Sequence, residues 1–191
     1  MTANKKRRLG GEFLEECLLT SMDLDALRHR LLAACLLQGD FTLRSGKKSR
    51  YYLDKYRFVL APELLAPLAQ AIAAKLPEGT EVLAGPELGA VPLVTATSLV
   101  TGLPGIIVRK EAKGYGTKNL IEGQLRPGAK AVLLEDVLTT GGQAVAAANA
   151  LRRIGAKVLA VIAVVDRGKE TEEAMEKAGL AYMPIFRVEL D

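Results

Sequence analysis

The sequence has few of the residues that build metal clusters and disulfide frameworks. Its 191 residues include one histidine, His29, and two cysteines, Cys17 and Cys35. A single histidine cannot supply a histidine-based metal cluster, and the two cysteines do not have metal-ligand spacing. So few cysteines are typical of a reducing cytosol rather than of a disulfide scaffold. We therefore expect a cytoplasmic protein in which Cys35 is a small core residue and His29 is structural or exposed.

Long hydrophobic runs are also missing. No stretch approaches the roughly 18 apolar residues of a membrane-spanning helix, and the amino-terminal leader lacks the apolar core of a secretory signal. The leader instead carries Lys5, Lys6, Arg7 and Arg8 without interleaved aromatic residues, a pattern typical of a solvated segment rather than of a nucleic-acid-binding arm. We expect no membrane partner, no nucleic-acid partner, and a disordered extension over residues 1–21.

Four short apolar runs indicate the core. They occupy residues 82–84, 106–108, 131–134 and 158–165. Continuous apolar strands separated by helical segments are typical of a parallel sheet covered on both faces. Hydrophobic residues make up 49% of the chain, and nothing in the composition marks a second domain. We therefore expect one α/β domain over residues 22–191, with a doubly wound, mainly parallel sheet.

Helical spacing of apolar residues marks the segments around these runs. The expected helices run from the cap Asp23 to near Gly39, from Pro62 to about Leu76, over residues 90–100, and over residues 143–154 with Gly155 as the closing residue. Residues 41–58 alternate aromatic and charged side chains around a turn, which predicts a hairpin that forms a small hood above the sheet. Residues 181–188 could add an edge strand or return to the hood.

The residues that follow the four apolar runs are suited to ligands. They are the segment 85–89, the pair Arg109 and Lys110, Asp136 with the loop after it, and the pair Asp166 and Arg167. Open parallel sheets bind ligands beyond the carboxyl ends of their strands. Four successive strand ends with charged or glycine-rich residues therefore predict a single site.

Residues 132–143 join an apolar strand to an alanine-rich helix through Glu135, Asp136 and a loop of small residues. Backbone N–H groups of residues 139–142 can surround a phosphate, because glycine permits close approach and the following helix offers unpaired donors and a favourable dipole. The carboxylates suit ribose hydroxyls, with Mg²⁺ moderating the negative charge. The segment therefore favours a ribose phosphate. In the alternative interpretation, Asp136 is only a cap and the loop only a tight turn.

Residues 110–123 form a long polar segment with three lysines and three glycines. Such a loop is typical of a mobile lid. Cations that close over a departing diphosphate would stabilise the charge that develops on it in the transition state. The alternative interpretation is a solvated charged hairpin.

The loop at residues 139–142 lacks the lysine of a Walker A motif and the glycine spacing of a dinucleotide fingerprint. The order of apolar strand, Glu135, Asp136, small residues, Gly141 and Gly142 instead resembles the ribose-phosphate signature of the type I phosphoribosyltransferases. Within that family, residues 41–52 are similar to the hood segment of the orotate phosphoribosyltransferases. Residues 109–116 and 121–123 are similar to their catalytic flap, although Tyr115 stands where the family often has histidine.

The resemblance implies transfer of a phosphoribosyl group from phosphoribosyl diphosphate to orotate, a step of pyrimidine and UMP biosynthesis. It implies Lys113, Arg109, Lys110 and Asp136 as catalytic residues, and Arg44, Tyr52, Thr139 and Arg167 as contacts of orotate. Contacts of phosphoribosyl diphosphate would be Arg109, Lys110, Lys113, Tyr115, Glu135, Asp136, Val137, Leu138, Thr139, Thr140, Gly141, Gly142 and Gln143. The cofactor would be Mg²⁺, held mainly by the substrate with Glu135 and Asp136 nearby. A homodimer is implied, in which the flap 110–123 reaches into the neighbouring subunit's site.

Three alternatives stay open at this point. Arg167 could pair bidentately with the orotate carboxylate, or it could be a surface ion-pair partner of Asp166. The acceptor could be a purine or another pyrimidine. The protein could also be a regulator that keeps the phosphoribosyl site and binds nucleic acid.

Overall fold

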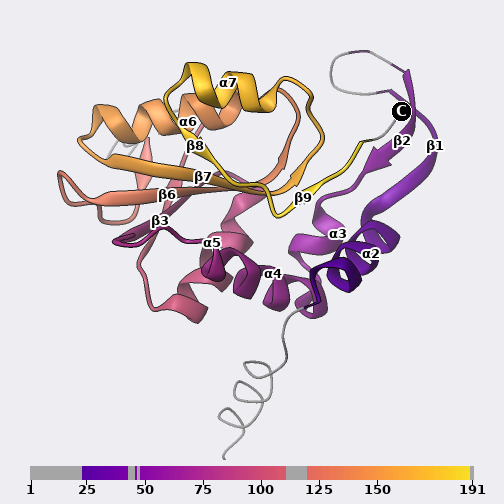
Figure 1. Ribbon diagram of the computed structural model, residues 1–191, viewed down its shortest axis with the longest axis horizontal. Helices are drawn as coiled ribbons and strands as arrows, with labels where there is room; N and C mark the ends of the chain where they lie inside the picture. The colour runs from indigo at the N-terminus through magenta and orange to yellow at the C-terminus, as the bar shows by residue number, and fades with distance from the viewer. Residues whose placement is uncertain (1–22, 43–45, 47, 111–119, 190–191) are drawn as a thin grey trace, which may run out of the picture.

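The computed structural model describes residues 23–42, 46, 48–110 and 120–189 (Figure 1). The predicted extension 1–21 lies outside these residues, as do Arg44, Lys113 and Tyr115. Among the helices that can be followed in these ranges, none is both long and apolar enough to cross a membrane.

The chain begins with helix α2 (Leu24–Cys35), which Asp23 caps by accepting hydrogen bonds from the amides of Asp25 and Ala26. The helix ends before the predicted end near Gly39, because Leu36 is already extended and begins strand β1 (Leu36–Thr42). Strand β1 pairs antiparallel with β2 (Lys48–Leu53). The predicted hairpin is therefore present, but its first strand starts earlier than residue 41.

Two helices follow the hairpin. The short α3 (Tyr56–Val59) replaces the end of the predicted hood segment and buries Phe58 and Val59 completely. Helix α4 (Pro62–Ala74) begins at Pro62 as expected and contains Pro67. Pro67 has no N–H for the carbonyl four residues earlier. That carbonyl, of Glu63, instead accepts a hydrogen bond of 2.8 Å from the Arg30 side chain.

The main sheet has the strand order β5-β4-β3-β6-β7-β8. Strands β3 (Val82–Pro86), β4 (Gly105–Val108), β6 (Lys130–Leu138) and β7 (Lys157–Asp166) run parallel to one another, and β5 (Ile121–Glu122) is antiparallel to β4. Strands β8 (Ala181–Tyr182) and β9 (Phe186–Arg187) both pair with β7. Residues 181–188 therefore form an interrupted sheet edge, the first of the two alternatives drawn from the sequence.

Helices cover both faces of this sheet (Figure 1). Alternation along β6 sends Val132 and Leu134 into a core shared with α2, α3, α4 and α5 (Ala90–Thr101), while Leu133 packs against α6 (Gly142–Arg153) and α7 (Thr171–Lys177). Helix α7 was not predicted from the sequence. The expected α/β class with a mainly parallel, doubly wound sheet is confirmed.

Two contacts tie the amino-terminal elements to the carboxyl edge of the sheet. A side-chain nitrogen of Arg28, in α2, lies 3.4 Å from the carbonyl oxygen of Arg187, to which it donates. Lys55, directly before α3, reaches Asp136 at the end of β6. The hairpin β1–β2 stands beside the main sheet, next to α2 and α3 (Figure 1).

Candidate functional site

The carboxyl end of β6 carries two adjacent buried carboxyl groups. Glu135 is 5% exposed and Asp136 is 4% exposed. Neighbouring side chains of a strand point to opposite faces of the sheet, so the two groups meet different surroundings. Asp136 has partners, whereas Glu135 Oε1 is buried and has no hydrogen-bond partner within the described part of the chain. A buried acceptor without a donor is a place where a ligand hydroxyl can bind.

The environment of Glu135 favours its neutral form. Burial, followed by the charge of Asp136, raises the pKa of Glu135 to about 8, and the ammonium of Lys55 opposes this shift only partly. A ligand that donates hydrogen bonds to Glu135 would replace the lost hydration and favour the carboxylate. A bound molecule with a hydroxyl group could therefore donate the hydrogen bond that Glu135 Oε1 does not receive from the described residues.

Asp136 is held from two sides. Its Oδ1 accepts a 2.6 Å hydrogen bond from the amide of Val137, and its Oδ2 lies 2.6 Å from the Lys55 ammonium. Partial burial lowers the pKa of Lys55, but the hydrogen bond and charge of Asp136 outweigh this, and the pKa lies above its ordinary value. The ammonium is therefore charged at neutral pH.

The loop after β6 presents the uncapped start of α6. Gly141 precedes the helix with φ +75°, and as the cap residue it has no side chain that could cap the helix end. A Cβ at Gly141 would lie 2.7 Å from Met175 Cε, so both the backbone angle and the packing against α7 require glycine. Thr139, Thr140 and Gly142 are exposed. Helix ends with this geometry bind anions through backbone N–H groups and the helix dipole.

Helix α7 and the turn before it support this loop from behind. The Thr171 hydroxyl donates to the carbonyl of Thr139 at 3.1 Å. A Cβ at Gly168 would lie 1.6 Å from the same carbonyl oxygen, so the two backbone segments approach each other as closely as glycine allows. The anion-binding loop is thus positioned by residues that the sequence motif did not include.

Glu87, which directly follows β3, contacts the two basic residues at the end of β4, for which the family resemblance implies contacts with the diphosphate. Its Oε2 lies 3.4 Å from Arg109 Nη1, and its Oε1 accepts a 2.9 Å hydrogen bond from the Lys110 amide. Arg109 Nη1 also lies 3.9 Å from Glu122 Oε1 in β5. Arg109, Lys110 and Gln143 line a cavity of about 230 Å³. The start of α6 and the end of β4 therefore border the same cavity.

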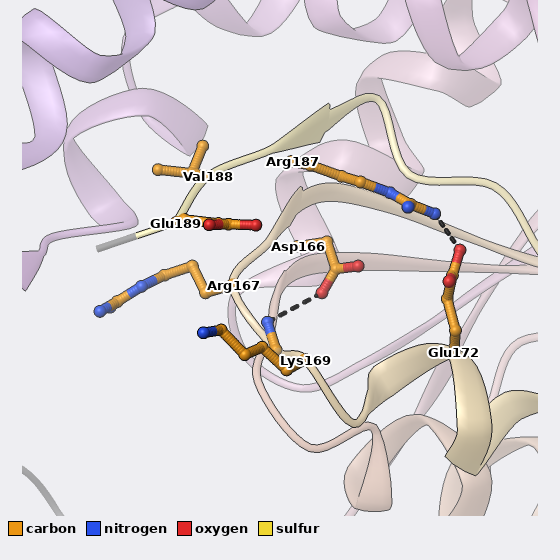
Figure 2. Close-up of a pocket in the computed structure, with 8 residues that line it drawn as sticks. Asp166, Arg167, Lys169, Glu172, Arg187, Val188 and Glu189 are labelled. Atoms are coloured by element: carbon orange, nitrogen blue, oxygen red, sulfur yellow. Dashed lines mark hydrogen bonds and ion pairs between the residues drawn. The ribbon is translucent and has the colours of Figure 1, made fainter. Parts of the chain in front are cut away.

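The end of β7 lines a second cavity, of about 420 Å³, whose lining includes Asp166, Arg167, Lys169, Arg187 and Glu189. Asp166 Oδ1 accepts a 3.0 Å hydrogen bond from the Gly168 amide. Figure 2 shows the Arg167 side chain directed away from Asp166.

Arg167 has no ion pair with Asp166 among the residues described, and its Nε is buried without a hydrogen-bond partner. Burial lowers the pKa of Arg167, opposed by the Cys35 thiol. Pairing with Asp166, the alternative drawn from the sequence, is therefore not found. Within the described residues the Arg167 Nε is therefore available as a donor, and a guanidinium donor suits a planar anion such as a carboxylate.

The hood contributes Tyr52, which lies on β2 with its side chain 44% exposed and its ring centroid 5.5 Å from that of Phe41. The other residues predicted there and in the flap, Arg44, Lys113 and Tyr115, are outside the described residues. Sequence reasoning missed Lys55 as a site residue, and it placed Glu87 at the site within the segment 85–89 without giving it a role. Lys55 stood in a segment already marked by its charges, but only the folded chain reveals its contact with Asp136.

No group of three histidine, cysteine, aspartate or glutamate side chains that could hold a metal ion occurs in the part of the chain that the structure describes. Glu135 and Asp136 supply carboxyl oxygens at the end of β6, directly before the loop that leads to α6. Mg²⁺ is often bound through one or two carboxylates together with substrate phosphates. The site therefore fits an ion that arrives with a phosphorylated substrate.

Comparison with known proteins agrees with this geometry. The phosphoribosyl transferase domain family matches residues 61–179. The orotate phosphoribosyltransferase of Nocardioides sp. is 45% identical over 172 residues, which are 89% of this chain and 96% of that protein. The orotate phosphoribosyltransferase of Thermococcus gammatolerans is 42% identical over 168 residues, with 86% and 89% covered.

Solved structures show the same relationship. The crystal structure of Mycobacterium tuberculosis orotate phosphoribosyltransferase in complex with 5-phospho-alpha-D-ribosyl 1-diphosphate has a TM-score of 0.73 at 30% identity, covering 87% of this chain and 96% of that one. Adenine phosphoribosyltransferase from Thermoanaerobacter pseudethanolicus shares the fold, with a TM-score of 0.66 at 16% identity over 84% and 99% of the two chains. The chain therefore belongs to the phosphoribosyltransferase family, and within it to the orotate phosphoribosyltransferases.

Proposed function

We propose that the protein transfers the phosphoribosyl group of 5-phosphoribosyl 1-diphosphate to orotate, which gives orotidine 5'-monophosphate and pyrophosphate for UMP biosynthesis. The proposal rests on the order in which carboxyl groups and backbone N–H donors follow one another at the end of β6. Two buried carboxyl groups, one with an unpartnered oxygen, are followed directly by the uncapped start of α6. A ribose with a 5'-phosphate presents hydroxyls and an anion in the same order.

In the proposed complex, backbone N–H groups of residues 139–142 bind the 5'-phosphate. Glu135 and Asp136 accept hydrogen bonds from the ribose hydroxyls. Arg109 and Lys110, fixed by Glu87, bind the diphosphate. These contacts fix the ribose on both sides of its anomeric carbon, so the acceptor can approach that carbon from the open side.

The reaction needs one proton transfer besides the exchange at carbon. A ring N–H nitrogen of orotate forms a bond to the anomeric carbon as the bond from that carbon to the diphosphate oxygen breaks. The electron pair leaves with pyrophosphate, which also takes up the proton that the nitrogen loses. Arg109, Lys110 and the flap residue Lys113 stabilise the charge that grows on the leaving group. Mg²⁺, when bound with the substrate, supplies further neutralisation of the diphosphate, with Glu135 and Asp136 nearby.

Arg167 is the proposed selector of the base. Arg167 is half-buried at the end of β7, and its Nε has no hydrogen-bond partner among the described residues. A guanidinium pairs bidentately with a carboxylate, which orotate carries and the common purines and other pyrimidines do not. Tyr52, Thr139 and Arg44 complete the proposed contacts of the base.

Two further parts of the proposal concern assembly and location. We propose a homodimer in which the flap 110–123 completes the neighbouring subunit's site, as the family resemblance implies. A cytoplasmic location stays a prediction from the low cysteine content of the sequence.

The test is a pyrophosphate-release assay with Mg²⁺, phosphoribosyl diphosphate and individual bases. Orotate should support turnover, whereas adenine, hypoxanthine and uracil should not. Arg167→Ala should raise the KM for orotate by about 100-fold with little change in the KM for phosphoribosyl diphosphate, because it removes a charge-assisted bidentate contact.

The matched control is Arg126→Ala, since the Arg126 side chain is 82% exposed and its ion pair among the described residues is with Glu81, outside the proposed site. Equal turnover with uracil or a purine would refute the proposed acceptor. An equal loss for both substrates in Arg167→Ala would refute the role of Arg167. Salt-sensitive nucleic-acid binding without turnover would favour the regulator instead.

A further inference from the structure

Three segments that are distant in the sequence meet at one oxygen of Asp136. Lys55 comes from the turn before α3, Gly89 directly precedes α5, and Asp136 ends β6. The Lys55 ammonium lies 2.6 Å from Asp136 Oδ2. A Cβ built on Gly89 would lie 1.5 Å from that same oxygen and 2.8 Å from the Lys55 nitrogen. The ion pair therefore rests directly on the backbone of Gly89.

We propose that Lys55 is a positioning residue of the phosphoribosyl site, which acts by fixing the Asp136 carboxylate, and that Gly89 is glycine to make room for this pair. The inference rests on the proposed function, and it adds two residues that the ribose-phosphate signature does not contain.

The backbone of Lys55 is anchored to the core, so its reach to Asp136 is set by the fold. The Lys55 carbonyl accepts hydrogen bonds from the amides of Phe58 and Val59, at 3.1 and 3.0 Å. Both of these side chains are 0% exposed. The adjacent amide of Asp54 donates to the carbonyl of Cys35 at 2.8 Å. A flexible surface lysine would not have this support.

The glycine at position 89 is explained by space rather than by backbone conformation. Its φ of −69° and ψ of −27° are ordinary helical values that any residue can adopt. What excludes a side chain is the carboxylate and the ammonium lying over its Cα. An alanine at this position would push the two charged groups away, even though it would not strain the backbone.

Asp136 needs an orienting partner because of its surroundings. It is almost completely buried and adjoins Glu135, whose own charge would repel it. The Val137 amide and the Lys55 ammonium fix one oxygen each. A carboxylate has about four lone-pair positions, so each oxygen keeps one for a ribose hydroxyl. Lys55 therefore orients Asp136 without filling its capacity to bind.

The experiment compares Lys55→Met with Arg57→Met. Each variant replaces a long cationic side chain by methionine, and the two positions are only two residues apart. Arg57 pairs with Asp54 at 3.4 Å, whereas the ion pair that the described residues give Asp136 is with Lys55. We expect Lys55→Met to raise the KM and the dissociation constant for phosphoribosyl diphosphate by about 10- to 100-fold, the range of one charge-assisted hydrogen bond. The KM for orotate should change less than about threefold, and Lys55→Arg should restore most of the binding.

Two further variants separate positioning from a general structural effect. Gly89→Ala should reproduce the selective loss of phosphoribosyl diphosphate binding with Lys55 still present. In a double-mutant cycle, Lys55→Met should add little to Asp136→Asn, because both remove the same interaction. Thermal unfolding of each free variant records any loss of stability independently.

The proposal is overturned if Lys55→Met behaves like Arg57→Met, if it weakens both substrates equally, or if its effect adds fully to that of Asp136→Asn. A wild-type protein without orotate-dependent pyrophosphate release would instead contradict the proposed function. Calorimetric binding of phosphoribosyl diphosphate by the wild-type protein and Lys55→Met would still test the positioning role in that case.

Discussion

Glu135→Gln should stabilise the ligand-free protein at alkaline pH while it weakens the binding of phosphoribosyl diphosphate. Glu135 is 5% exposed, its Oε1 has no hydrogen-bond partner in the described chain, and its pKa is raised from 4.5 to about 8. The substitution keeps the size and one acceptor oxygen but removes the ionisable group. It therefore isolates the cost of placing a carboxyl group in a site built for a ligand.

The sign of the pH dependence follows from the raised pKa of Glu135. Below its ordinary pKa of 4.5, the group is protonated in both the folded and the unfolded chain, and folding costs nothing extra. As the pH rises toward 8, the unfolded chain loses this proton while the folded chain keeps it, so the free energy of unfolding falls. The loss amounts to about 3 kcal/mol at pH 7 and about 5 kcal/mol above pH 8.

The assay is urea unfolding of the free protein and the variant at pH 5, 7 and 9, with Glu176→Gln as an exposed control. The buried amide of glutamine adds a cost of its own, but that cost does not vary with pH. The difference in unfolding free energy between variant and wild type should therefore grow by about 4 kcal/mol from pH 5 to pH 9. Parallel pH curves for Glu135→Gln and wild type would refute the reasoning.

Three further results are expected. Gly141→Ala should lower the free energy of unfolding by about 2 kcal/mol or more and weaken phosphate binding, because it combines a φ of +75° with a contact of 2.7 Å to Met175. Gly128 has a similar φ but lies in open space, so Gly128→Ala should lower the free energy of unfolding by less in the same denaturation assay. Equal losses for the two variants would contradict the packing argument. Burial raises the pKa of the Cys35 thiol to about 11. In a Cys17→Ser variant, Cys35 should therefore resist Ellman's reagent at pH 8 until the protein is unfolded. Fast reaction of the native variant would contradict the burial of Cys35. Chelation of divalent metal should abolish pyrophosphate release and added Mg²⁺ should restore it, whereas turnover that persists in chelator would argue against Mg²⁺ as cofactor.

Much of the fold could be predicted because the responsible interactions are local. Apolar runs at residues 82–84, 106–108, 131–134 and 158–165 became β3, β4, β6 and β7, and Asp23 and Pro62 began helices as expected. The family resemblance read from residues 132–143 is confirmed by the comparisons. In each case the signal lay within a few residues of the structure it specified.

The predictions that differed depended on contacts between distant segments. Strand β1 takes over residues 36–39, which were expected to end the preceding helix, because residues 36–38 pair with β2. Helix α7 has only seven residues and is stabilised by the packing of Met175 into the core. The local sequence pattern did not predict this helix.

In the site, too, residues marked by local sequence signals could be predicted, and residues that depend on distant contacts could not. The carboxyl groups, the loop and Arg167 could be assigned from the order of residues after each strand. The roles of Lys55 and Glu87 could not, because each depends on a partner more than twenty positions away in the sequence.

The central claim is that the carboxyl end of β6 and the start of α6 together hold a ribose phosphate. The most direct measurement is a crystal structure of the protein with phosphoribosyl diphosphate and Mg²⁺. We expect the 5'-phosphate on the amides of residues 139–142 and the ribose hydroxyls within hydrogen-bond distance of Glu135 and Asp136. A sugar phosphate bound elsewhere, with Glu135 still buried and unpartnered, would contradict the account.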